Sequence, residues 1–264
     1  ELPIYTFRMI TACGGGVCML LVAFWSGNRL TLHRRDVGAT MLCGFFTITA
    51  WLYFTALALT LLPAGRAAVL AYTMPLWSAL AGTWLLQEPL TRRRAVSLGF
   101  GLLAVLVLAG DDLGRLDAAP FGVLAILAAA ASWGLGTVIQ KRTPWNTPLF
   151  TVAAWQLLFG GVPLAVLAFI LDEDPYADFT LKGALGMTYV VLVATVIGYW
   201  LWFRVIQMVP AGIAALSVLP VPLIGLSLST IFLDERLGWP DLAALICMTI
   251  ALAIILPLPR FRRR

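Results

Sequence analysis

A duplicated stretch constrains the fold of this chain more than any other feature of its sequence. The first copy, "PAGRAAVLAYTMPLWSALAGTWLLQEPL", occupies residues 63–90, and the second, "PAGIAALSVLPVPLIGLSLSTIFLDERL", occupies residues 210–237. The two align without a gap at an offset of 147 residues, with 11 of 28 positions identical. Each copy opens with Pro-Ala-Gly and carries a proline near its middle, Pro75 and Pro222. The chain is therefore expected to contain one structural unit twice.

The composition places both copies in a membrane. Of the 264 residues, 61% are hydrophobic and only 12% are charged, whereas soluble domains carry about 25% charged residues. Apolar runs of about 20 residues match the thickness of a bilayer core. An all-α membrane protein is predicted, with nine apolar segments that cross as helices. They are residues 4–25, 37–59, 64–86, 95–110, 120–140, 148–171, 181–203, 211–233 and 240–258.

Chemistry that depends on metals, cofactors or nucleic acids is not indicated. The four cysteines lie inside apolar runs without metal-ligand spacing. The single histidine lies in a loop, and no paired carboxylates lie in the middle of a segment, so a membrane enzyme is not expected. A structural or assembly subunit is not expected either, because such a protein would have no need for a duplicated unit. The expected partners are the lipid bilayer and a small-molecule substrate, and a monomer is expected.

Charges at the segment ends predict the orientation. Cytoplasmic connections carry an excess of Lys and Arg. If the first segment ends in the cytoplasm and the others alternate, 13 of the 18 Lys and Arg lie inside. The outside loops are then acidic, as in "LDEDPYADFT". We predict a membrane protein whose intact termini are both cytoplasmic.

In this orientation the two copies of the duplicated stretch run in opposite directions. Residues 63–90 lead into the inside loop "TRRRAV", and residues 210–237 lead into an outside loop. Such an inverted-topology repeat is typical of transporters. The second copy has five segments and the first has four, so a 5+5 protein is expected whose first helix is missing here. The predicted repeats are residues 1–113 and 114–264.

Several motifs occur in a definite order and spacing. They are "AAASWGLGTVIQKR" at 129–142, the two Pro-Ala-Gly starts, and the "QEPLT" and "DERLG" ends. In these motifs the sequence resembles the EamA-type branch of the drug/metabolite transporter superfamily. Within the branch it is similar to amino-acid exporters of the YddG type, and this resemblance implies a location in the bacterial inner membrane. The resemblance implies a 5+5 inverted repeat and export of amino acids or related metabolites.

Two kinds of residue are candidates for the transport site. Prolines within a membrane helix remove a backbone hydrogen bond and kink the helix, and hinges are predicted at Pro75, Pro220 and Pro222. Aromatic and polar residues that share a helix face could line a cavity or could pack between helices. The candidate substrate-binding residues are Trp51, Tyr72, Trp133, Thr137, Gln140, Trp155, Gln156 and Tyr199.

Arg8 is a charged residue inside an apolar segment, which is costly and marks a functional hypothesis. It lies about five residues from the outer end of its segment. A structural role, paired with the backbone or with a polar residue of a neighbouring helix, is favoured over contact with a substrate carboxylate.

The sequence predicts an exporter of small neutral metabolites, with aromatic or other apolar amino acids as the leading class. Alternating access would carry the substrate downhill, because the apolar segments hold no Asp, Glu or His near their middle for proton coupling. The alternative is a proton-coupled drug/metabolite antiporter whose coupling carboxylate lies on the missing first helix.

Overall fold

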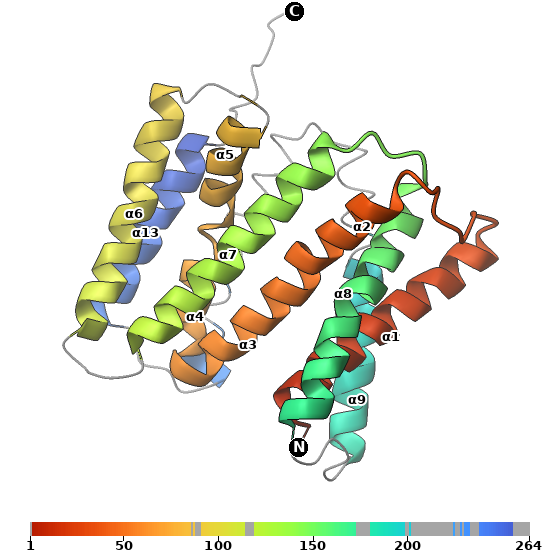
Figure 1. Cartoon of the computed structure of the whole chain (residues 1–264). Coiled ribbons are helices and arrows are strands. Elements are labelled where there is room, and N and C mark those ends of the chain that lie inside the picture. Colours follow the sequence, from red (N-terminus) through yellow and green to blue (C-terminus); the bar gives the residue numbers. More distant parts are fainter. Residues whose placement is uncertain are drawn as a thin grey trace, which may run out of the picture. The chain divides into compact units, whose positions relative to one another are not determined.

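The computed structural model describes residues 2–85, 87, 91–113, 119–172, 180–198, 201, 224, 228, 230–232 and 238–255. Their regular secondary structure is helical throughout (Figure 1). The elements are α1 (Ile4–Trp25), α2 (Val37–Gly44), η1 (Phe45–Ala50), α3 (Trp51–Leu61), α4 (Ala64–Ala71), α5 (Met74–Leu85), α6 (Arg92–Leu113), α7 (Ala119–Arg142), α8 (Leu149–Leu171), α9 (Leu181–Tyr189), η2 (Val190–Ile197) and α13 (Trp239–Ile255).

The predicted membrane segments correspond closely to these helices. Within the described residues, four helical stretches are long and apolar enough to cross a bilayer: Ile4–Trp25, Val37–Leu61, Pro120–Arg142 and Leu149–Leu171. Three shorter apolar helices lie at Ala95–Val107, Leu181–Ile197 and Trp239–Ala251. The predicted segment 211–233 lies almost wholly outside the described residues.

The chain forms two compact units that differ from the two predicted repeats. The first unit contains Glu1–Ala56 and Leu135–Val205, and the second contains Leu57–Gly134 and Ile206–Arg264. The divisions therefore fall inside α3 and inside α7. Each unit takes helices from both copies of the duplicated sequence. The repeat boundary near residue 113 stays a prediction.

In the first unit, α1 packs against α8 in the antiparallel direction (Figure 1). The N–H and hydroxyl of Thr6, near the start of α1, both donate to Asp172, just after the end of α8. Further along α1, a Cβ added at Gly161 would lie 2.5 Å from the sulfur of Cys13. A shift of 147 residues places α1 opposite 151–172, so the two neighbours are equivalent helices of the two copies.

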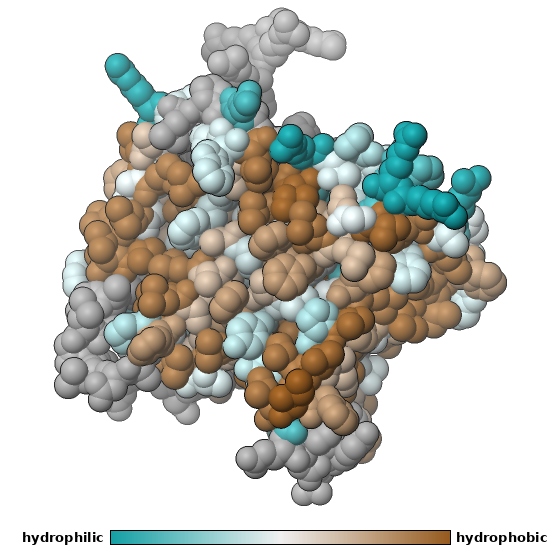
Figure 2. Space-filling model, in the orientation of Figure 1, coloured by the Kyte–Doolittle hydropathy of each residue, from teal (hydrophilic) through white to brown (hydrophobic). Residues whose placement is uncertain are grey.

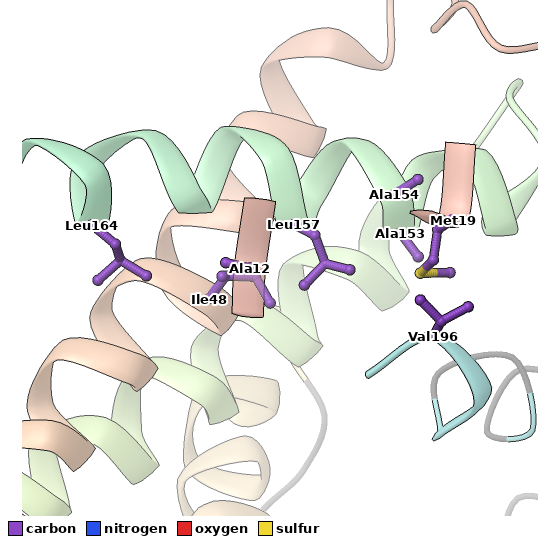
Figure 3. Close-up of a cluster of buried hydrophobic side chains, with 8 residues drawn as sticks. All are labelled: Ala12, Met19, Ile48, Ala153, Ala154, Leu157, Leu164 and Val196. Carbon is purple, nitrogen blue, oxygen red and sulfur yellow. The ribbon is translucent and has the colours of Figure 1, made fainter. Parts of the chain in front are cut away.

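Four elements of the first unit share one apolar core, drawn in Figure 3. Helix α8 supplies half of the side chains, and α1, η1 and η2 supply the rest. The buried residues are Ala12, Met19, Ile48, Ala153, Ala154, Leu157, Leu164 and Val196. Lipid is as apolar as this core, so helices associate through close van der Waals packing, which explains the number of small residues.

In the second unit, α6 and α13 form the corresponding antiparallel pair, side by side in Figure 1. Their starts, Arg92 and Trp239, differ by 147 residues. The Ser97 hydroxyl donates to the carbonyl of Ala251 at 2.6 Å, and Arg93 donates to the carbonyl of Ile254. Ser97 and Ala251 are fully buried, as are their equivalents in the other copy. Those equivalents are Ala244 and Ala104.

Antiparallel contact between equivalent helices in both units is the arrangement that an inverted repeat produces. The prediction of an all-α membrane protein with an inverted repeat is thereby confirmed. Large apolar side chains cover the outer faces of the described helices (Figure 2). Trp25 and Trp239, at a helix end each, are 84% and 77% exposed, as expected of aromatic residues at a membrane interface.

Candidate functional site

The helix predicted over 64–86 is interrupted near its middle. Helix α4 ends at Ala71, Tyr72 and Thr73 form a turn, and α5 begins at Met74. The Thr73 N–H and hydroxyl both donate to the carbonyl of Leu70, at 3.1 and 2.8 Å. In membrane transporters, broken helices of this kind place backbone groups and side chains at the substrate site.

Pro75 accounts for the position of this break. A proline has no N–H to donate to the carbonyl four residues earlier, that of Ala71, and its ring clashes with that carbonyl. Proline is accepted in the first turn of a helix, where Pro75 lies in α5. The chain therefore ends one helix and starts another. Whether Pro75 acts as a hinge stays a prediction.

Two π-helical segments occupy equivalent positions in the two copies. Segment η1 ends at Ala50 and η2 ends at Ile197, which differ by 147 residues. π-Helical turns are rare and are frequent at functional sites. The six residues of η1, "FFTITA", have no identity with their equivalents "LVATVI" at 192–197. No sequence signal could therefore have revealed this feature.

Each π-helical segment packs closely against a glycine of the other copy. A Cβ added at Gly160 of α8 would lie 2.5 Å from Ile48 Cβ, and one added at Gly15 of α1 would lie 2.6 Å from Thr195 Cγ2. Ile48 and Thr195 are themselves equivalent at the 147-residue offset. The hydroxyl of Thr49 also donates to the carbonyl of Gly160 at 2.7 Å. Equivalent positions of the two π-helical segments therefore each pack against a glycine, although the two glycines are not equivalent.

The predicted stripe on α7 falls on both sides of the division between the two units. Trp133 belongs to the second unit, whereas Thr137 and Gln140 belong to the first. Thr137 is exposed and the other two are half-buried. The Gln140 carbonyl accepts a hydrogen bond from the indole N–H of Trp145 at 2.9 Å. The three residues share one face of α7 by their spacing of four and three positions, and their role in substrate binding stays a prediction.

Trp155 and Gln156 are neighbours on α8 with different environments. The Trp155 indole N–H donates to the carbonyl of Leu30 at 2.7 Å, and its ring lies against Phe159. The N–H of Trp155 is therefore engaged by the protein. Gln156 is 5% exposed, and its side-chain nitrogen has no hydrogen-bond partner. A buried amide nitrogen without an acceptor is costly and is suited to receiving a polar ligand.

The remaining candidates are distributed over several elements. Trp51 begins α3 and is half-buried, and Tyr72 is half-buried at the helix break between α4 and α5. Tyr199, Pro220 and Pro222 lie outside the described residues.

Arg8 lacks the structural partner that was expected for it. Its Nε is buried and makes no hydrogen bond. Its guanidinium carbon lies 5.8 Å from the ring centre of Phe7. The expected pairing with the backbone or a polar neighbour is therefore not made by this nitrogen. Asp172 accepts its bonds from Thr6 instead.

Two loops with predicted cytoplasmic locations meet at Asp36. Its buried carboxylate accepts hydrogen bonds from the backbone N–H groups and side chains of Asn146 and Thr147, at 2.7–3.0 Å. Burial alone would raise the pKa of the Asp36 carboxyl, but these hydrogen bonds outweigh it and hold the pKa below its usual value. The backbone N–H of His33 also donates to the Thr147 hydroxyl. The carboxylate thus joins the loop before α2 to the loop before α8.

The described residues offer polar groups of a few kinds within the long apolar spans. Within them, no group of three or more His, Cys, Asp and Glu side chains is arranged to hold a metal ion. The four long apolar spans contain no Asp, Glu or His. Apart from Lys141 and Arg142 at the end of one span, their polar groups include hydroxyls, thiols, amides, indoles and the Arg8 guanidinium, which can take part in hydrogen bonds.

Comparison with known proteins identifies relatives of this chain. "Uncharacterized transporter YoaV" of Bacillus subtilis is 24% identical over 238 residues, which cover 90% of this chain and 82% of that protein. A "Probable amino-acid metabolite efflux pump" of Escherichia coli is 27% identical over 247 residues, covering 89% and 82%. "Protein PecM" of Dickeya dadantii is 28% identical over 266 residues, covering 97% and 84%.

A solved crystal structure has the same fold. It matches with a TM-score of 0.68 at 20% sequence identity, covering 96% of this chain and 88% of that one. The EamA-like transporter family matches residues 1–110 and again residues 120–256. The two matches cover both copies of the duplicated sequence. On this evidence the chain belongs to the EamA-like transporter family.

Proposed function

We propose that this protein exports small neutral metabolites, with amino acids that carry aromatic or other apolar side chains as the leading class. The observation that carries the proposal is the antiparallel pairing of equivalent helices, α1 with α8 and α6 with α13. Such a pseudo-symmetric pair of repeats can exchange conformations, so that a site faces each side of the membrane in turn. The name of the Escherichia coli relative supports the substrate class.

The proposed location is the bacterial inner membrane, with both intact termini in the cytoplasm and a single chain as the working unit. The proposed substrate contacts are made by aromatic rings, amides and hydroxyls. Such groups suit a zwitterion with an apolar side chain. They belong to Trp51, Tyr72, Trp133, Thr137, Gln140, Trp155, Gln156 and Tyr199, with hinges at Pro75, Pro220 and Pro222.

Transport is proposed to be downhill. Proton coupling requires a group that changes protonation between the two access states, and Asp, Glu and His are absent from the four long apolar spans. A high cytoplasmic concentration of the amino acid would then supply the driving force.

Proteoliposomes test the function and the coupling separately. Vesicles loaded with unlabelled phenylalanine or leucine should take up the labelled amino acid by exchange, and empty vesicles should not concentrate it. Absence of exchange for every amino acid would refute the proposed substrate class. With equal substrate on both sides, an imposed pH gradient should cause no net accumulation. Uphill accumulation would instead support the proton-coupled antiporter.

A further inference from the structure

Arg8 lies on the face of a membrane-spanning helix that the protein itself covers. Ala12, Gly15 and Met19 follow it on α1 at spacings that keep them on one side of the helix. All three are buried. A Cβ added at Gly15 would contact Thr195 and Leu157, so this face packs against η2 and α8. The Arg8 side chain is half-buried.

The charge of Arg8 is not balanced within the described part of the chain. Its Nε is buried without a hydrogen-bond partner, and its recorded contact is with the ring of Phe7. Arg66, in the second unit, shows the usual solution, because it pairs with Asp241 at 2.8 Å where both side chains are nearly buried. An intramembrane guanidinium without such a partner is costly and is available to an anionic group.

Aromatic rings lie close to Arg8 in the chain. Tyr5 precedes it by one helical turn, and residues three apart on a helix are neighbours. The Tyr5 ring stacks on Tyr53 of α3 with 6.0 Å between centroids, and Tyr53 meets Phe54 edge-on at 5.2 Å. A guanidinium beside aromatic rings combines a binding group for a carboxylate with an apolar surface for a side chain.

We propose that Arg8 binds the carboxylate of the transported amino acid and so selects zwitterions over amines and uncharged analogues. The inference rests on the proposed amino-acid export and assigns it a recognition residue. A guanidinium donates two parallel N–H bonds to a carboxylate. In the four long apolar spans, Arg8 is the single Lys or Arg that does not lie at the end of its span. One cation matches one carboxylate, whereas a doubly charged phosphate ester would favour several.

Gln156 carries a second unengaged buried nitrogen, in the other copy, and is not part of the proposed carboxylate site. At the 147-residue offset, Arg8 corresponds to Trp155, and the next residue, Gln156, carries the other buried nitrogen without a partner among the described residues. Each copy therefore presents an unengaged N–H donor in nearly the same place on equivalent helices. Because α1 and α8 are antiparallel, the two donors lie toward opposite ends of the first unit.

The test compares a substrate that has a carboxylate with one that lacks it. Exchange of phenylalanine and of phenylalaninamide is measured in proteoliposomes with wild-type protein, Arg8→Gln, Arg8→Lys and the control Arg35→Gln, which removes an exposed loop cation. Arg8→Gln should raise the KM for phenylalanine by ~10-fold or more, because a charge-assisted pair is lost. Its KM for phenylalaninamide should stay within ~2-fold of the wild-type value. The KM of Arg8→Lys for phenylalanine should lie between those of wild type and Arg8→Gln, since the lysine ammonium is a point charge.

A second measurement separates recognition from folding. Phenylpropionate, which keeps the carboxylate and lacks the amine, should inhibit exchange by wild-type protein and should not inhibit Arg8→Gln. If Arg8→Gln loses exchange of phenylalanine and of phenylalaninamide equally, the proposal is overturned and Arg8 has a structural role. If replacing anionic by neutral lipids abolishes the difference between wild type and Arg8→Gln, the residue binds a lipid phosphate and the proposal fails. If Arg8→Gln does not fold, the test uses Arg8→Lys instead. Its KM should rise for phenylalanine and not for phenylalaninamide, and an equal change for both would overturn the proposal. Absence of amino-acid exchange in wild-type protein would refute the proposed function itself.

Discussion

The carboxylate of Asp36 accepts hydrogen bonds from both the backbone N–H and the hydroxyl of Thr147, at 2.8 and 2.7 Å. The two residues are 111 positions apart in the sequence. Asn146 adds a backbone and a side-chain bond, each of 3.0 Å. A buried carboxylate with four hydrogen bonds fixes one loop against another.

Replacing Asp36 by Asn should destabilise the protein by ~1–3 kcal/mol, because an amide nitrogen would then face hydrogen-bond donors. Thermal unfolding in detergent measures the change. Thr147→Val, which removes one bond and keeps the N–H, should cost less. Equal melting temperatures for Asp36→Asn and the wild type would show that the carboxylate does not hold the loops.

The same carboxylate predicts a pH dependence with a definite sign. Its folded-state pKa is lowered, so its contribution to stability is present above the unfolded-state value of ~3.9. That contribution is lost as the pH falls through the lowered folded-state value. The melting temperature of wild-type protein should therefore fall more steeply below about pH 4 than that of Asp36→Asn. Parallel curves would contradict the assignment.

Large side chains at the α6–α13 contact should separate the two helices. Ala104 and Ala251 are fully buried, and small residues allow such helices to approach closely. Ala104→Leu or Ala251→Leu should reduce the yield of monodisperse protein on size-exclusion chromatography. The control is Leu102→Ala on the exposed side of α6, where 60% of the residue is accessible. Ser97→Ala should lower the free energy of unfolding by only ~0.6 kcal/mol, which is the average contribution of an interhelical hydrogen bond in a membrane.

Gly160→Ala should be poorly tolerated, since the new Cβ would lie 2.5 Å from Ile48 Cβ and 2.6 Å from the backbone oxygen of Gly44. Neither atom is the flexible end of a side chain, so α8 and the π-helical segment η1 would have to separate. Gly38→Ala, which meets nothing within 4 Å, is the matched control. Comparable melting temperatures and exchange rates for the two variants would contradict a close fit at Gly160.

Cysteine accessibility tests the predicted orientation. In a variant without its four native cysteines, a single cysteine at Arg35 should react with an impermeant reagent from the cytoplasmic side, and one at Lys182 from the opposite side. Both positions are exposed. Labelling of both from the same side would contradict the charge-based topology.

Single alanine substitutions at Tyr72, Trp133 and Tyr199 test the predicted substrate contacts. Each removes an aromatic ring that could pack on an apolar substrate side chain, so exchange should fall several-fold at unchanged expression. Trp25→Ala is the control, because this ring is 84% exposed at a helix end and its removal should leave exchange unchanged. Normal exchange in all three alanine variants would remove these residues from the site.

The sequence by itself determined the membrane class, most helix positions and the repeat. Helix α1 spans the predicted residues 4–25. Its bounds could be predicted because the thickness of the bilayer core sets the length of the apolar run, and that length is visible in the sequence. The helix break before Pro75 also follows from local chemistry, since a missing N–H acts on the preceding turn. The inverted arrangement could be inferred because flanking charges record the direction of each copy.

Only the tertiary structure decided which groups are partnered. The sequence places Asp36 in a charged loop and Arg8 in an apolar segment, and neither setting reveals the partners. Asp36 accepts four hydrogen bonds, whereas Arg8 Nε makes none. The π-helical segments could not be predicted either, because η1 and its equivalent share no residues. Ile48 and Thr195, one in each segment, make their close contacts with glycines more than 100 positions away along the chain. Hydropathy is a property of single residues, whereas hydrogen-bond satisfaction and helix register depend on neighbours that the fold brings together.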